Sequence, residues 1–229
     1  ERRRRGLIVL LSAANPAYSS AMRRILILCL GLLAATFGVA GADPVGRAVF
    51  TPAQRADLTR VNAYLNSIHT MTGGFSQIDP NGDIDQGTFA IAKPGKMRFE
   101  YKPPTPSLIV SDGKTVAVQN SRLKTVDRYS LSDTPLDIIL GDNVDLLNDH
   151  SITGVEHQQD ALVVHARSRG SNAQGNISLV FAEPNLELRQ WTVVDNQGLQ
   201  TTVVLRDVRI GADVSHISFL IPPKNSAAH

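Results

Sequence analysis

The sequence predicts a single, mostly β domain of the α+β class whose antiparallel sheet is either barrel-like or sandwich-like. Three observations predict it: short segments in which apolar and polar residues alternate, turn signals at regular spacing between them, and only two stretches with helical features. Strands joined by tight turns pair antiparallel, because parallel strands need long crossover connections. The sequence contains no internal repeat and no low-complexity linker that would indicate a second domain.

The chain begins with segments that indicate export. Met22 and two arginines precede the apolar run 25–39, and the small residues 40–42 follow it, which is the layout of a cleavable secretory signal. The run has about 15 residues, fewer than the ~20 that a membrane-spanning helix needs, and an uncleaved anchor is the alternative. We expect residues 1–42 to comprise an upstream extension and a signal peptide (Met22–Ala42), and residues 43–229 to form one domain.

The composition of that domain excludes several classes of function. Six of the 23 basic residues and one of the 21 acidic residues lie in 1–42, which leaves 17 basic against 20 acidic residues, a net charge of −3. No basic stripe with interleaved aromatic residues occurs, so we expect no nucleic-acid partner. The only cysteine, Cys29, lies within the signal, so the mature domain has no disulfide and no cysteine metal site. This is compatible with the periplasm.

A first helix is expected to begin after Thr51, which is suited to cap it. Pro52 takes the first helical position, and Gln54 follows the cap by three residues, as in a capping box. Apolar residues then recur at helical spacing and form one stripe, typical of a helix that packs on a core: Leu58, Val61, Leu65 and Ile68.

A second helix of about two turns is expected over residues 134–141. Thr134 is a possible cap, Pro135 stands at the first helical position and Gly141 is a typical end. A helix this short is not stable alone, so its apolar residues must lean on another element, most simply the concave side of the sheet.

The strands are expected to fill most of the remaining chain. Turn signals separate them, among them Asn81-Gly82, Asp112-Gly113 and 196–198. Residues 217–223 are a candidate edge strand that two prolines end. The expected strands are 75–79, 84–92, 96–102, 108–110, 115–120, 123–129, 151–156, 161–167, 176–181, 186–194 and 200–210.

The most informative segment lies between Gly87 and Gly113. A strand ends at a Lys93-Pro94-Gly95 turn, and a second strand follows in which aromatic and apolar residues alternate with charged ones. A proline-rich corner, 103–106, separates it from a short apolar strand. The segment ends with the letters Val-Ser-Asp-Gly-Lys at 110–114.

This segment resembles the core signature of the LolA family, the periplasmic carriers of outer-membrane lipoproteins. The resemblance implies an incomplete antiparallel β-barrel, a half-barrel closed by a helical lid, around an apolar cavity that receives acyl chains. Five apolar residues match positions that the resemblance places in the cavity: Phe89, Ile91, Met97, Phe99 and Ile109. For each of them, plain core packing is the alternative.

The resemblance also implies a lid with four named residues: Lys93, Leu136, Ile139 and Leu140. In the family, a basic residue just before the proline of the signature bonds backbone carbonyls of the lid and keeps it closed without cargo. Lys93 stands there, whereas well-studied members carry arginine, so the closed state is expected to be weaker or closed by another route. The alternative is that Lys93 is a plain turn residue.

The function implied is that of a soluble periplasmic carrier, a monomer, that ferries lipoproteins from the inner to the outer membrane. Its implied partners are acylated lipoproteins, an inner-membrane lipoprotein-releasing ABC transporter, and an outer-membrane receptor or the outer membrane itself. A carrier of a free lipid, and a sensing module that binds lipid or lipoprotein on the same fold, are the alternatives.

Catalytic and metal motifs are absent from the sequence. There is no nucleophile elbow, no phosphate-binding glycine loop and no dinucleotide fingerprint. Residues 79–85 superficially resemble a calcium loop, but the glycine and the twelfth position do not fit one, which favours a solvated hairpin tip. His165 is expected to be a hydrogen-bonded strand residue. We therefore expect no enzyme activity, no cofactor and no metal.

Overall fold

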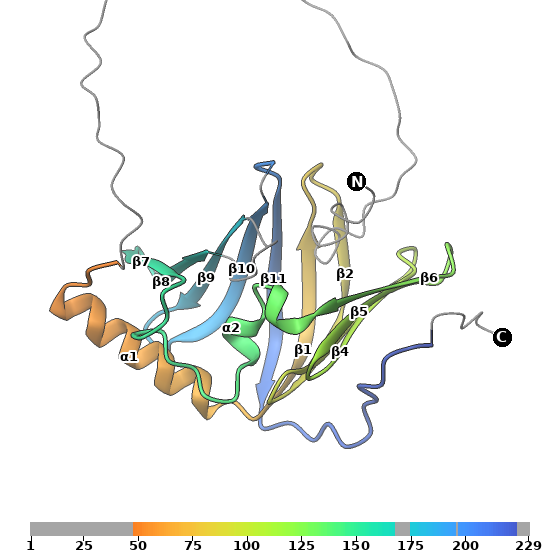
Figure 1. The fold of residues 1–229 in the computed structure, drawn as a ribbon, viewed down its shortest axis with the longest axis horizontal. Coiled ribbons are helices and arrows are strands. Elements are labelled where there is room, and N and C mark those ends of the chain that lie inside the picture. The colour runs from red at the N-terminus through yellow and green to blue at the C-terminus, as the bar shows by residue number, and fades with distance from the viewer. Residues whose placement is uncertain (1–47, 168–174, 196, 224–229) are drawn as a thin grey trace, which may run out of the picture.

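In the computed structural model, residues 48–167, 175–195 and 197–223 are described, and they form one antiparallel sheet of eleven strands (Figure 1). The strand order is β6-β5-β4-β3-β2-β1-β11-β10-β9-β8-β7. The expected signal segment, residues 1–42, lies outside the described residues. The sheet is not closed into a barrel, because β6 and β7 remain at opposite edges. The predicted half-barrel is therefore confirmed at the level of the sheet.

The elements agree with the predicted order along the chain. The helices are α1 (Pro52–Ser67) and α2 (Asp137–Leu140), with a 3₁₀ turn at Leu131–Asp133. The strands are β1 (Thr70–Ile78), β2 (Ile84–Ala92), β3 (Lys96–Tyr101), β4 (Ser107–Asp112), β5 (Thr115–Asn120), β6 (Thr125–Ser130), β7 (Ile152–Gln158), β8 (Ala161–Arg167), β9 (Gly175–Ala182), β10 (Glu187–Asp195) and β11 (Gln200–Ile210).

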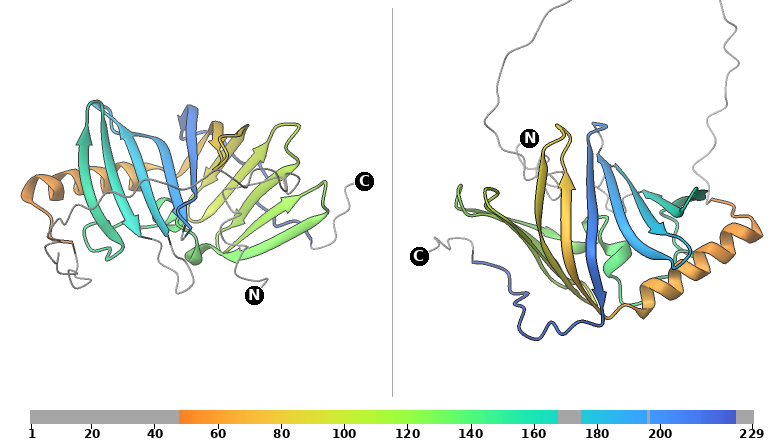
Figure 2. Two further views of the ribbon diagram at one scale, coloured as in Figure 1. Left: turned by 90° about the horizontal axis from the view of Figure 1, so that it is seen from above. Right: turned by 180° about the vertical axis from the view of Figure 1, so that it is seen from behind.

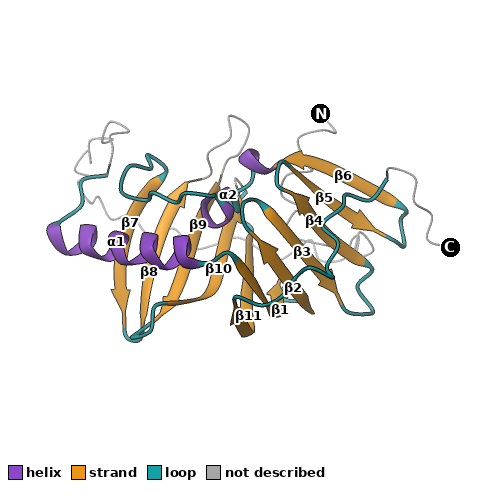
Figure 3. Ribbon diagram, turned by 90° about the horizontal axis from the view of Figure 1, so that it is seen from below, coloured by secondary structure: helices purple, strands orange, loops and turns teal. Residues whose placement is uncertain are grey.

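Helix α1 forms as its cap predicts. The Thr51 hydroxyl accepts from the Gln54 backbone N–H at 3.3 Å, and the Gln54 side chain accepts from the Thr51 N–H at 3.0 Å, which completes the capping box. Leu58, Val61 and Leu65 are buried. The helix lies across the face of β7 to β10, as Figure 3 shows, and covers that half of the sheet.

The predicted helix at 134–141 is shorter than expected, and its predicted cap is wrong. Helix α2 has four residues, and Leu136 precedes it without a side-chain cap. The Thr134 hydroxyl donates instead to the Leu131 carbonyl at 2.8 Å, because the chain has already formed a 3₁₀ turn there. Tertiary packing therefore holds α2, since Ile138, a residue of its single turn, is 2% exposed.

The candidate edge strand at 217–223 is also wrong. These residues form no strand and run outside the sheet (Figure 2). Arginine side chains hold this segment: Arg98 donates to the Ser218 carbonyl at 3.4 Å, and Arg128 to the Pro222 carbonyl at 2.6 Å. Prolines 222 and 223 have no N–H to offer a ladder, so side-chain bonds replace it.

The sheet curls strongly across its centre. Phe99 on β3 and Trp191 on β10 are four strands apart, which is about 19 Å in a flat sheet. Their ring centroids are nevertheless 5.9 Å apart, so the two halves of the sheet fold toward each other over a concave face. A bulge between Thr72 and Gly74, where β1 pairs with β11, lies in the central pair of strands.

Candidate functional site

The concave face carries a cluster of aromatic side chains centred on Phe99. Its ring stacks on Phe89 at 5.5 Å and meets Phe75 edge-on at 5.0 Å, and Trp191 contacts it from the other half of the sheet. Tyr101 meets Phe75 edge-on at 5.0 Å. Such pairs add about 0.5–1.5 kcal/mol each beyond the burial of their area, so the cluster stabilises the curled sheet.

The five apolar residues predicted for the cavity share this face. Phe89, Phe99 and Ile109 are direct partners across β2, β3 and β4, and Ile91 is the partner of Met97. Direct partners in an antiparallel sheet point to the same side. All five are buried and belong to the same core as the aromatic cluster. The structure thus brings the predicted cavity residues together.

The three apolar residues predicted for the lid lie in that core too. Leu136, Ile139 and Leu140 are buried, and α2 lies over the concave face between the two halves of the sheet (Figure 3). The side chains of this helical segment and of the sheet therefore form one continuous apolar core. A ligand that is to occupy the concave face must displace part of that core.

Lys93 connects the β2–β3 turn to α1. Its ammonium group donates to the Leu65 carbonyl at 2.8 Å, near the C-terminal end of the helix, where a cation is favourable. In the same turn, the Gly95 N–H donates to the Leu140 carbonyl of α2 at 2.9 Å. The turn 93–95 is thus the place where both helices are hydrogen-bonded to the sheet.

Partial burial changes the acidity of Lys93. Loss of water around the ammonium lowers the pKa of Lys93, and the nearby Asp142 carboxylate opposes that shift. The hydrogen bond to α1 is therefore made at a desolvation cost. Because of this cost, the net stabilisation from the bond is smaller than that of a charged hydrogen bond formed without desolvation.

Two asparagines of α1 hold the chain that follows α2. The Asn66 side chain donates to the Val144 carbonyl at 2.9 Å and accepts from the Val144 N–H at 2.8 Å. Asn62 accepts from the Leu146 N–H at 2.9 Å. These residues were not predicted as part of the site. The available signal was two amides four residues apart, beside the apolar stripe of the helix.

Helix α1 is also bonded to the far half of the sheet. Gln54 donates to the Val155 carbonyl of β7 at 3.0 Å, and Asp57 pairs with the His157 ring at 2.9 Å. Tyr64 accepts from the Leu188 N–H of β10 at 3.0 Å. Helix α1 is therefore attached to the sheet at β7, at β10 and at the β2–β3 turn.

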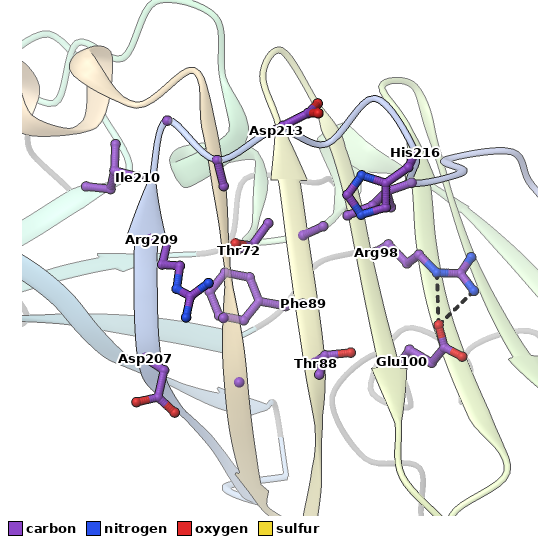
Figure 4. Close-up of a pocket in the computed structure, with 16 residues that line it drawn as sticks. Thr72, Thr88, Phe89, Arg98, Glu100, Asp207, Arg209, Ile210, Asp213 and His216 are labelled. Carbon is purple, nitrogen blue, oxygen red and sulfur yellow. Dashed lines mark hydrogen bonds and ion pairs between the residues drawn. The ribbon is translucent and has the colours of Figure 1, made fainter.

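A hollow of about 950 Å³ lies outside the sheet, against β1 to β3 and the segment after β11 (Figure 4). Its lining mixes polar and charged residues with apolar ones, and Arg98 and Glu100 form an ion pair there at 2.9 Å. Among the predicted cavity residues, Phe89 lines this groove and Ile91, Met97, Phe99 and Ile109 do not.

Two further predictions, for the hairpin tip at 79–85 and for His165, are confirmed. The Asp79 carboxylate accepts from the N–H groups of Asn81 and Asp83, so the calcium-like loop is a hairpin tip. His165 on β8 is hydrogen-bonded to the Ser178 hydroxyl at 2.9 Å. Within the described residues, no cluster of three metal-ligating side chains occurs, and no helix has the length and apolar character needed to cross a membrane.

Comparison with known proteins gives consistent matches over most of the chain. Residues 66–221 match the family described as outer membrane lipoprotein carrier protein LolA. The outer-membrane lipoprotein carrier protein of Chromobacterium violaceum is 27% identical over 82% of this chain and 94% of its own length. That of Xylella fastidiosa is 31% identical over 65% of this chain and 74% of its own length. A LolA superfamily structure from Nitrosomonas europaea matches 71% of this chain and 97% of its own, with 12% identity and a TM-score of 0.40.

Proposed function

The chain belongs to the LolA family of outer-membrane lipoprotein carrier proteins, and from this premise we propose that it binds the acyl chains of lipoproteins and carries them across the periplasm. The observation that supports this proposal best is the concave apolar face, lined by the predicted cavity residues and covered by a short helical segment.

The need for such a carrier follows from the cost of exposing acyl chains. Moving one methylene from an apolar setting into water costs about 0.8 kcal/mol, so a protein with several acyl chains does not leave a membrane unaided. A carrier has to replace the bilayer with an apolar surface of its own. The concave face offers that surface, and in the cargo-free state the apolar side chains of α2 keep water from it.

Loading then requires α2 to move. Its attachment to the sheet includes a hydrogen bond from the Gly95 N–H to the Leu140 carbonyl, and a one-turn helix has little stability of its own. Acyl chains that replace Leu136, Ile139 and Leu140 against the sheet exchange one apolar contact for another, so the net free-energy change stays small. Met97, buried beside Ile91, is unbranched and polarizable and suits a surface that repacks around different chains.

The same proposal includes the setting and partners. We propose that residues 43–229 form the mature periplasmic domain, acting as a monomer without cofactor or catalytic role. It would receive cargo from an inner-membrane lipoprotein-releasing ABC transporter and deliver it to an outer-membrane receptor or the outer membrane itself. The family's description names a carrier and no reaction, which supports the non-enzymatic role.

The molecule that the protein binds in the cell tests the proposed function. The protein is to be purified from the periplasm without detergent, and the bound material analysed by mass spectrometry. Acylated lipoprotein is the expected result. Free phospholipid or another lipid in its place would contradict lipoprotein carriage and favour lipid transport on the same fold. Protein that is consistently free of any acyl-bearing molecule, and takes up none when incubated with lipoprotein, would contradict both.

A further inference from the structure

Two hydrogen-bond donors are buried on the concave face without acceptors. In the described part of the chain, the Gln77 Nε2 and the Trp191 Nε1 are buried atoms with no partner, and their residues are 1% and 2% exposed. Burying a donor away from water without a partner is unfavourable, so an unsatisfied group in a native structure calls for an explanation. A ligand that brings a hydrogen-bond acceptor to these donors is one such explanation.

The two donors lie in one row of the sheet. Gln77 on β1 and Trp191 on β10 are both direct partners of Val203 on β11, so all three side chains point to the same face. Two strand spacings, about 10 Å, separate the backbones of the two donor residues. The row therefore places the two donor residues on either side of a buried valine.

Both donors are in contact with the aromatic cluster. Trp191 meets Phe99 edge-on, and the Tyr101 hydroxyl donates to the Gln77 Oε1 at 2.7 Å. That bond uses the acceptor of the Gln77 amide and leaves its N–H₂ group as the unpaired end. Trp191 thus lies next to Phe99, a predicted cavity residue, and Gln77 lies next to Tyr101, and all four side chains are buried.

The surroundings favour a neutral acceptor over an anion. Asp85 on β2 is the direct partner of Gln77 and shares its face, and its carboxylate accepts from the Thr105 hydroxyl. A negative charge beside the donors repels a carboxylate or a phosphate. A carbonyl oxygen carries no net charge and accepts a hydrogen bond. It can therefore bind the two donors without being repelled by the Asp85 carboxylate.

Resting on the proposed function, we propose that Gln77 and Trp191 form a polar subsite that binds the ester or amide carbonyl oxygens joining acyl chains to their head group. The subsite sets how deep within the concave face the first carbon of each acyl chain lies. The chains continue over the aromatic cluster, and the head group remains outside. In the cargo-free state the donors are unsatisfied, and cargo supplies the missing acceptors.

The test uses Trp191 as its own reporter, since it is the only tryptophan in the chain. The full mature protein is labelled with ¹⁵N, and the single indole N–H resonance is followed with three probes: a triacylated cysteine lipopeptide, dioleoylglycerol, and the hydrocarbon diphenylhexatriene. The proposal expects a downfield proton shift with the two carbonyl-bearing probes and none of that size with the hydrocarbon. Comparing the first two separates lipoprotein anchors from free lipid as the source of the carbonyl.

Two substitutions extend the test to affinity. Trp191→Phe and Gln77→Met each remove a donor while keeping most of the apolar volume, and each is expected to weaken binding of the lipopeptide about tenfold while diphenylhexatriene binding changes little. Gln190→Met is the matched control, because Gln190 precedes Trp191 on the same strand and points to the opposite face. It should leave both affinities unchanged.

The outcomes separate this inference from the proposed function. If wild-type protein takes up none of the probes, carrier function fails and the subsite with it. If all three bind but the indole resonance responds equally to each, the subsite is refuted while carriage of acyl chains stands. Equal losses for lipopeptide and hydrocarbon in Trp191→Phe, with an unchanged melting temperature, would also refute it.

Discussion

Replacing Lys93 with methionine removes the side chain that joins α1 to the β2–β3 turn while keeping an unbranched stem. The lost bond, from the ammonium to the Leu65 carbonyl, is part-buried and made against a desolvation cost. We therefore assign it about 1 kcal/mol, within the usual net range of a protein hydrogen bond. By the relation between free energy and equilibrium constants, this shifts the ratio of open to closed molecules about fivefold toward open.

The expected consequence is tighter loading and slower release. The cargo-free closed state loses a bond, whereas the loaded state gains apolar contact from the methionine side chain. We expect a hydrophobic fluorescent probe to bind Lys93→Met several-fold more tightly than wild type, and lipoprotein transfer to acceptor membranes to slow by a similar factor. Titration of the probe and a vesicle transfer assay measure the two quantities.

A matched control tests whether the bond or the charge is responsible. Lys96 is three residues away and exposed, so Lys96→Met removes the same charge without touching the contact with α1. It should bind probe and release cargo like wild type. Equal effects of the two substitutions would assign the change to net charge, and unchanged release by Lys93→Met would remove Lys93 from the mechanism.

Three further predictions concern the core, the loop after α2 and alkaline stability. Phe99→Asp should abolish uptake of the fluorescent probe, because it places a charge at the centre of the aromatic cluster; a folded variant that binds normally would show that the wrong face was assigned. Asn66→Ala removes two bonds to Val144 and should lower the free energy of unfolding by about 1–3 kcal/mol in urea titrations. Burial first, and then the Asp127 charge, raises the pKa of Tyr129 to about 12, so its contribution to stability is complete below the ordinary tyrosine pKa of about 10 and is lost as pH rises toward 12. Tyr129→Phe should therefore flatten the decline in stability over that interval; an unchanged slope would contradict the assignment.

Local patterns in the sequence predicted the elements well and the curvature not at all. The cap at Thr51 and the alternation around Phe99 act over a few residues, and both appear in the structure as expected. The contact between Phe99 and Trp191 depends on β1 pairing with β11, far apart in the chain. No local pattern reports such a pairing, so the half-barrel could be proposed only from the family resemblance.

For the candidate site, the sequence likewise predicted which residues share a face but not which contacts they make. The positions of Phe89 and Phe99 on one face follow from strand alternation, and the structure places them together. The role of these residues in binding stays a prediction. The partner of Lys93 could not be derived, because a lysine in a turn reaches several carbonyls and only the packed position of α1 decides which one. Thr134 was misassigned for a related reason: a residue suited to cap a helix serves a preceding 3₁₀ turn equally well.

The position of α2 follows from the order of the strands. β6 and β7 are consecutive in the chain but lie at opposite edges of the sheet, so residues 131–151 have to cross from one edge to the other. The crossing places α2 over the concave face, as seen in Figure 1, without making it part of any strand ladder. Displacing α2 therefore leaves every pair of strands hydrogen-bonded. A closed barrel would place β6 and β7 side by side, so the segment that crosses the concave face exists because this sheet is open.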